Sequence, residues 1–158
     1  MASRFSQLDD RVRNFGPVSG GKELDPAEYA TGVLKFEADP QQLFVLGSRA
    51  SRLLLCCSRQ WGKSTTAAAL VCHRLVTVPR ALVLCVAPTL RQSAELIRKV
   101  DEFLETAGVA ATGGRLGLTL KNGARVVALP GNEANVRGYS SPSLIVIDEA
   151  ARVPDLLY

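Results

Sequence analysis

Three short apolar runs, separated by helical stretches, dominate the pattern of hydrophobic and polar positions along the chain. Residues 53–57, 81–87 and 144–147 are almost continuously hydrophobic, which is typical of parallel strands covered on both faces. Residues 63–76 have a helix-forming composition, and residues 89–107 place their apolar side chains on one helical face. This alternation predicts an α/β fold in which helices cover both faces of a parallel sheet.

The remaining positions add a hairpin and a polar arm. Asn122-Gly123 separates two strand-like runs at residues 118–121 and 124–129, and this dipeptide between strands is a strong hairpin signal. Asp39-Pro40 begins a short helix. Glycines and prolines interrupt the segment before it. We therefore expect residues 1–35 to form a loosely ordered N-terminal arm and residues 36–158 to form the folded domain.

Composition narrows the class of protein without identifying a partner. The chain has 158 residues, of which 47% are hydrophobic and 22% charged, as in a single globular domain. Its formal net charge of +4 permits a polyanionic partner and does not require one. No apolar run approaches the roughly 20 residues that cross a membrane, so no membrane partner is expected. The four cysteines lack metal-ligand spacing, and free thiols suit a reducing cytoplasm.

A candidate phosphate-binding loop lies between the first predicted strand and the first long helix. Residues 58–65 read Ser-Arg-Gln-Trp-Gly-Lys-Ser-Thr, in the strand–turn–helix context that such a loop requires. Gly62 lets the backbone approach phosphate oxygens, and the amides that follow it attract an anion. Lys63 would reach the β and γ phosphates, and the Ser64 hydroxyl would bind Mg²⁺. Thr65 is expected beside the α phosphate.

Two carboxylates follow the last predicted strand. Asp148 and Glu149 come directly after the apolar run at residues 144–147, and open α/β sheets bind ligands at this end of their strands. Asp148 would hold Mg²⁺ through the water shell of the ion. Glu149 would orient and deprotonate the attacking water. Together with the loop, this acidic strand end predicts a nucleoside triphosphatase that uses ATP and Mg²⁺.

The amino-acid sequences of these motifs resemble those of tailed-phage terminase large subunits. Their variant Walker A motif often carries an Arg-Gln pair and lacks the first glycine. In this sequence the pair is Arg59-Gln60, and Cys57 stands at the position of the first glycine. The resemblance covers about residues 36–155 and implies an ASCE-type P-loop NTPase with a parallel sheet flanked by helices and an inserted β-hairpin. Further similar segments are residues 39–42, 86–93, 129–131, 136–139 and 148–151.

The resemblance also implies roles that spacing alone does not assign. Arg59 would stabilise charge at the γ phosphate, like an arginine finger acting in cis. Arg137 would serve the site of an adjacent subunit or contact DNA. Asp148 is the metal ligand, and Glu149 is the catalytic carboxylate. The implied nucleotide-binding residues are Gln42 at the adenine, Ser58, Gln60, Trp61 (unless it only packs beside the loop), Gly62, Lys63, Ser64 and Thr65.

The implied activity is ATP binding and hydrolysis for viral DNA packaging. The implied partners are double-stranded DNA, a portal protein and a small terminase subunit, with a homo-oligomeric ring in the full-length protein. The setting would be the cytoplasm of the host cell. A helicase-like DNA translocase is the alternative that shares the Ala-Pro-Thr segment at residues 87–89.

The sequence departs from the family after the acidic strand. Terminase large subunits continue into further strands and a nuclease domain, whereas this sequence stops at Tyr158. We therefore expect residues 36–158 to be a partial P-loop ATPase domain with an incomplete sheet and an open edge. The chain would be a fragment, one piece of a split protein, or an inactive truncated prophage remnant. Turnover of ATP by this chain alone is not predicted.

Overall fold

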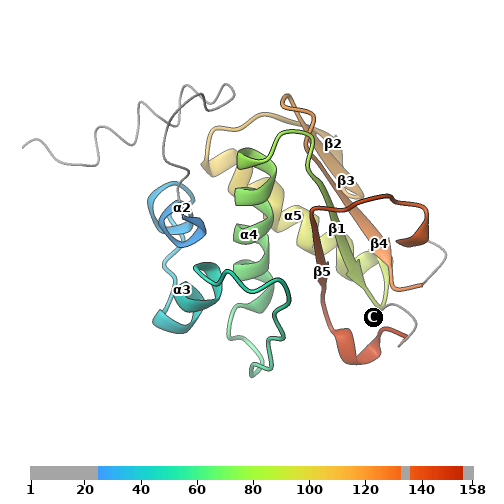
Figure 1. Cartoon of the computed structure of the whole chain (residues 1–158), viewed down its shortest axis with the longest axis horizontal. Helices are drawn as coiled ribbons and strands as arrows, with labels where there is room; N and C mark the ends of the chain where they lie inside the picture. The colour runs from blue at the N-terminus through green and yellow to red at the C-terminus, as the bar shows by residue number, and fades with distance from the viewer. Residues whose placement is uncertain (1–24, 133–135, 155–158) are drawn as a thin grey trace, which may run out of the picture.

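The protein, seen here as a computed structural model, is described for residues 25–132 and 136–154. Its centre is a five-stranded sheet with the order β2-β3-β4-β1-β5 (Figure 1). Strand β1 runs parallel to both β4 and β5, whereas β2, β3 and β4 pair antiparallel in sequence. The strands are β1 (Leu82–Ala87), β2 (Ala111–Gly114), β3 (Gly117–Leu120), β4 (Arg125–Pro130) and β5 (Leu144–Ile147). The predicted α/β class and its parallel core are confirmed.

The predicted hairpin at Asn122-Gly123 is confirmed as the β3–β4 connection. The backbone N–H of Leu120 donates to the Ala124 carbonyl over 2.8 Å, and Gly123 has a φ of 80° that favours glycine. The Asn122 side chain also donates to the Leu75 carbonyl over 2.8 Å, which fixes the turn against the preceding helix. Strand β2 was not predicted, because its Ala-Thr-Gly-Gly sequence carries no strand signal.

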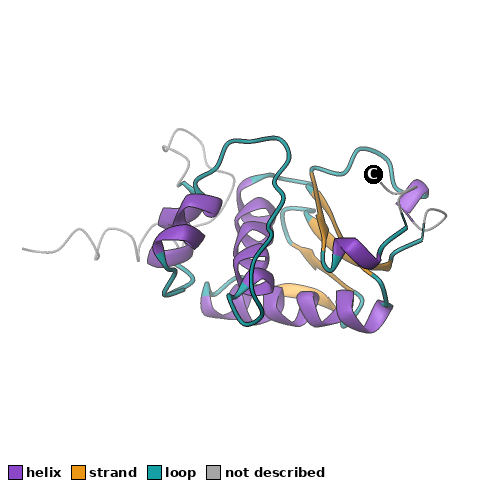
Figure 2. Cartoon of the chain, turned by 90° about the horizontal axis from the view of Figure 1, so that it is seen from below, coloured by secondary structure: helices purple, strands orange, loops and turns teal. Residues whose placement is uncertain are grey.

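Four helices lie on one side of the sheet: the two long helices pack against its strands, and the two short helices pack against the first long helix. They are α2 (Pro26–Gly32), α3 (Pro40–Leu46), α4 (Lys63–Thr77) and α5 (Leu90–Thr106). Helix α5 begins at a capping box in which Thr89 and Gln92 satisfy each other's backbone amides. All four helices contribute buried side chains to one core cluster with the same sheet face, and the long helices lie together beside the strands (Figure 2).

The opposite face of the sheet is covered differently from the prediction. Leu82, Leu84 and Val86 of β1 are buried there, and the side chains of Val136 and Tyr139 pack against them. No described helix of more than one turn covers this face, so the expectation of helices on both faces is wrong for the described residues. The segment before β5 takes that place.

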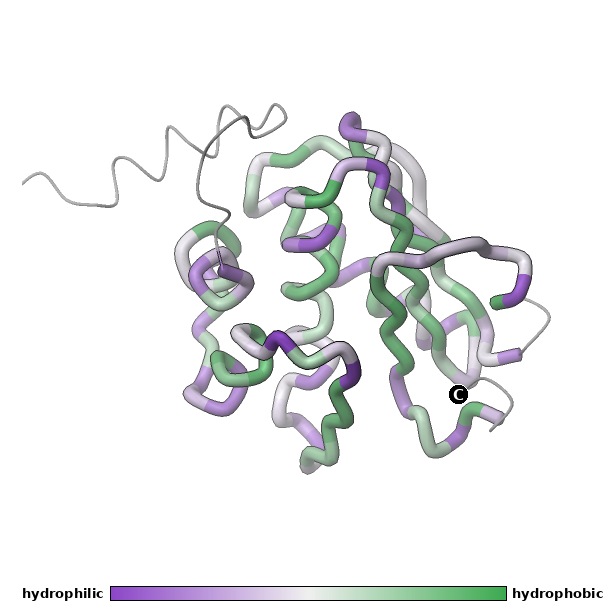
Figure 3. Tube along the Cα trace, in the orientation of Figure 1, coloured by the Kyte–Doolittle hydropathy of each residue, from purple (hydrophilic) through white to green (hydrophobic). Residues whose placement is uncertain are grey.

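The predicted strand at residues 53–57 is also wrong. These residues belong to the loop that precedes α4, where Figure 3 shows a hydrophobic stretch outside the sheet. Leu53 is 46% exposed and Leu54 is 81% exposed. No described strand pairs with this run, and β5 remains the edge strand on this side of the sheet. The expected open edge of the sheet is present at β5 among the described strands.

The predicted N-terminal arm is corrected for residues 25–35. Asp25 caps the start of helix α2, and its side chain accepts a hydrogen bond from the Ala27 amide over 2.9 Å. Tyr29 and Leu34 are buried against the other helices, so this part folds with the domain. Residues 1–24 lie outside the described part of the chain. Within the described residues, no helix has the length and hydrophobicity needed to span a membrane.

Candidate nucleotide-binding site

The predicted phosphate loop forms a tight turn directly before α4. Gln60 and Gly62 adopt left-handed backbone conformations, with φ values of 65° and 91°. The φ of Gly62 favours glycine, and a Cβ atom there would also lie 2.7 Å from the Gln42 side-chain nitrogen, which would have to shift. Gly62 caps α4 without a side-chain hydrogen bond, which leaves the first amides of α4 available to an anion.

An open cavity of about 330 Å³ lies over this helix N-terminus. Five of its lining residues belong to the predicted loop, and one comes from α5. The lining residues are Gln60, Gly62, Lys63, Ser64, Thr65 and Lys99. The cavity therefore combines backbone amides, two hydroxyl groups and two lysine side chains, which is the chemistry that binds phosphate.

The side chain of Lys63 turns back over its own loop. Its ammonium donates hydrogen bonds to the carbonyls of Ser58 at 3.0 Å and Cys57 at 3.3 Å. Among the described residues, no carboxylate lies within ion-pair distance of Lys63. The Lys63 ammonium is thus hydrogen-bonded to neutral carbonyls at the cavity, and a phosphate group would be a stronger partner for it.

Ser64 and Asp148 meet across the site although they are 84 positions apart in the sequence. The Ser64 hydroxyl donates to Asp148 Oδ2 over 3.3 Å. Asp148 is placed by the end of β5, since its amide continues the ladder by donating to the Val86 carbonyl over 2.8 Å. A hydroxyl and a carboxylate are the oxygen ligands that Mg²⁺ accepts alongside phosphate and water. The donor set fits the predicted Mg²⁺ site.

Glu149 is held in an unusual backbone conformation. Its φ of 50° and ψ of 43° are left-handed, and its amide donates to Asp148 Oδ1 over 3.0 Å. The carboxylate is exposed, and its contact with Arg152 at 3.4 Å is a surface ion pair that contributes little stability. A non-glycine residue in this conformation is strained, and such strain is concentrated at functional sites. Glu149 thus stands next to the Ser64–Asp148 contact with its carboxylate available.

Comparison with solved structures finds this architecture in viral packaging proteins. The ATPase domain of the large terminase of Thermus phage P74-26 matches with a TM-score of 0.71 at 24% identity, and a mutant of it with 0.68 at 23%. Each match covers 83% of this chain and 61% of the other. The chain has the fold of a large-terminase ATPase domain. The fold implied by the motif resemblance is confirmed. No family model matches the sequence, and a search of curated proteins found no match.

Within this terminase ATPase fold, the predicted residues that lie outside the cavity lining are Gln42, Ser58, Arg59, Trp61, Arg137, Asp148 and Glu149. Ser58 and Arg59 are exposed on the loop, and Trp61 is half-buried beside it. Arg137 is exposed on the segment that covers the far face of the sheet. Their predicted roles at the nucleotide, at an adjacent subunit or on DNA stay predictions.

Gln42 connects α3 to the phosphate loop. Its Nε2 donates to the Trp61 carbonyl over 2.7 Å, while its Oε1 accepts from the Asp39 amide over 2.9 Å. Only 6% of the residue is exposed. Both ends of the carboxamide therefore bind backbone and hold the loop, a role that the sequence did not indicate. Recognition of adenine by Gln42 stays a prediction.

Replacing Gln42 with alanine is expected to destabilise the domain by about 1–3 kcal/mol, because the Trp61 carbonyl and the cap of α3 lose their partner. Urea denaturation would measure the change in the free energy of unfolding. Gln41→Ala is the matched control, since Gln41 is exposed. Equal stability of the two variants would contradict the anchoring role.

Proposed function

We propose that this chain binds Mg²⁺·ATP and hydrolyses it as the ATPase part of a DNA-packaging motor. The observation that carries the proposal is the Ser64–Asp148 contact, which joins the phosphate loop to the acidic end of β5. The terminase ATPase fold supports the same assignment. The chain spans about three fifths of the length of those domains, so packaging itself belongs to the proposal.

Each residue of the site would make a separate contribution. The amides at the start of α4 and the Lys63 ammonium would bind the triphosphate. Ser64 and Asp148 would hold Mg²⁺, which supplies charge neutralisation at the β and γ phosphates when it is bound. Glu149 would orient the attacking water and accept its proton. Arg59 would approach the γ phosphate from the exposed side of the loop.

The partners proposed for this chain follow from the packaging assignment. They are double-stranded DNA, a portal protein and a small terminase subunit in the host cytoplasm, with the chain acting in a homo-oligomeric ring. Arg137 is the residue proposed to reach an adjacent site or a DNA phosphate, and its exposure permits either contact.

Calorimetric titration of the whole chain with ATP tests the nucleotide site. We expect Mg²⁺ to strengthen binding, and Ser64→Ala and Asp148→Asn to weaken that Mg²⁺ effect by about tenfold or more, because Ser64→Ala removes an oxygen ligand and Asp148→Asn removes the negative charge of the other ligand. Ser51→Ala is the control, since Ser51 is exposed on the preceding loop. Equal ATP affinity with Mg²⁺ and with a chelator, in all four proteins, would contradict the metal site.

A further inference from the structure

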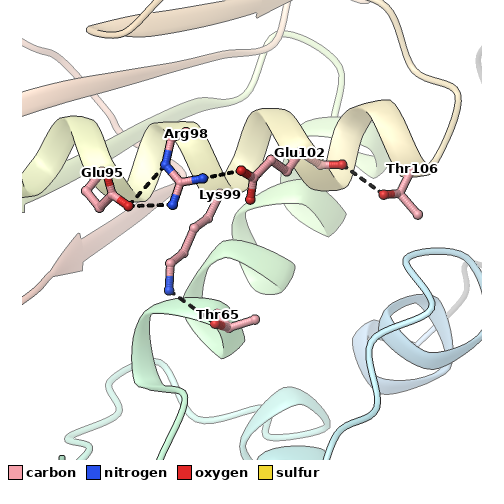
Figure 4. Close-up of polar contacts among 6 residues, drawn as sticks. All are labelled: Thr65, Glu95, Arg98, Lys99, Glu102 and Thr106. Carbon is pink, nitrogen blue, oxygen red and sulfur yellow. Dashed lines mark hydrogen bonds and ion pairs between the residues drawn. The ribbon is translucent and has the colours of Figure 1, made fainter. Parts of the chain in front are cut away.

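A second lysine points into the cavity from another helix. Lys99 extends from the middle of α5 to the first turn of α4, where its ammonium donates to Thr65 Oγ1 over 3.2 Å (Figure 4). The two residues are 34 positions apart in the sequence. Lys99 is half-buried and lines the cavity together with Lys63 and Ser64. No sequence motif marked it.

The neighbouring charges of α5 make the setting of Lys99 distinctive. Arg98 forms hydrogen-bonded ion pairs with Glu95 and Glu102 along the helix surface (Figure 4). Within the described ranges, no carboxylate lies within ion-pair distance of Lys99. Glu95 and Glu102 are thus paired with Arg98, and the Lys99 ammonium donates a hydrogen bond to a neutral hydroxyl. A half-buried cation in such a setting gains most from an anionic ligand.

The two contacts of the α4 N-terminus lie on different sides of the helix. Ser64 contacts Asp148 of the β5 end, whereas Thr65 contacts Lys99 of α5. Successive residues of an α-helix point about 100° apart, so these contacts cannot share one direction. A polyphosphate lying over the helix start would therefore have the Mg²⁺ ligands on one side and Lys99 on the other.

We propose that Lys99 is a second phosphate-binding lysine that contacts the α phosphate of the nucleotide on the Thr65 side. This assignment rests on the proposed function, because it requires a nucleotide in the cavity. Lys63 binds the β and γ phosphates beside the metal, and Lys99 binds the α phosphate, which is nearest the nucleoside. Lys99 consequently strengthens binding of ADP as much as binding of ATP.

Lys99→Gln tests the proposal by removing the charge while keeping a polar group near Thr65. We expect the dissociation constants for ATP and for ADP to rise by a similar factor of about tenfold or more, as for a lost charge-assisted hydrogen bond. Binding of adenosine should not change. Lys99→Arg should restore most of the affinity. Arg98→Gln, which removes the same charge from the same helix surface, should leave both constants unchanged.

Thermal unfolding without nucleotide separates binding from a structural role. Lys99→Gln should unfold at the wild-type temperature, because one hydroxyl contact of a half-buried side chain is lost. A lowered unfolding temperature without rescue of affinity by Lys99→Arg would overturn the proposal, as would loss of ATP affinity without loss of ADP affinity. If the wild type binds ATP and Lys63→Ala abolishes that binding while Lys99→Gln does not weaken it, only this inference fails. If the wild type binds no nucleotide, the proposed function fails with it.

Discussion

Lys63→Ala is expected to weaken binding of Mg²⁺·ATP by about 10- to 100-fold. Lys63 is the first residue of α4 and lines the cavity, and a hydrogen bond to a charged group contributes about 1.5–3 kcal/mol. Its present partners, the carbonyls of Ser58 and Cys57, belong to an exposed loop. Alanine should therefore cost binding energy and little folding energy. Calorimetry for affinity and thermal unfolding for stability would measure the two effects on one preparation.

Lys121→Ala is the matched control for this experiment. Lys121 is exposed in the β3–β4 turn, so its removal changes the net charge by the same amount outside the cavity. A general electrostatic effect would weaken binding in both variants. Unchanged ATP affinity in Lys63→Ala would remove the basis of the phosphate-binding assignment.

The elements with strong local patterns were predictable from the sequence. Continuous apolar runs located β1 and β5, and helical composition and periodicity located α4 and α5, to within about two residues, although β5 is only partly buried at the edge of the sheet. The loop and the acidic pair were also local, since glycine, lysine and a strand end specify them. The Ser64–Asp148 contact then followed from the rule that ligands gather at the carboxyl ends of parallel strands.

Features that depend on tertiary partners were not predictable from one sequence. The apolar run at residues 53–57 predicts a buried strand, yet a strand forms only when its backbone pairs with another strand, and this run pairs with none of the described strands. Lys99 contacts Thr65, which is 34 positions away in the sequence, and Gln42 contacts Trp61, which is 19 positions away. Such contacts depend on how α3 and α5 pack against α4, which periodicity does not specify.

Glu149→Gln is expected to lower the rate of ATP hydrolysis by about 10²–10⁴-fold while leaving ATP affinity near the wild-type value. The carboxamide keeps the shape of the side chain but cannot accept a proton from water. The left-handed backbone at Glu149 and its bond to Asp148 should survive, because the amide N–H makes that bond. Single-turnover release of phosphate, with the protein in excess over ATP, would measure the rate.

Glu105→Gln provides the comparison, since Glu105 is exposed near the end of α5 and lies outside the cavity lining. If Glu149 is the general base, Glu149→Gln should lower the rate of hydrolysis without changing ATP affinity. If Glu149 is purely structural, the variant should lower both the rate and the affinity. The ion pair with Arg152 adds a second criterion. If that contact at 3.4 Å merely orders the turn, Arg152→Gln should leave hydrolysis unchanged. If the ion pair with Arg152 instead holds the Glu149 carboxylate away from the attacking water, Arg152→Gln should raise the rate of hydrolysis. Adding Glu149→Gln to that variant should then abolish the increase.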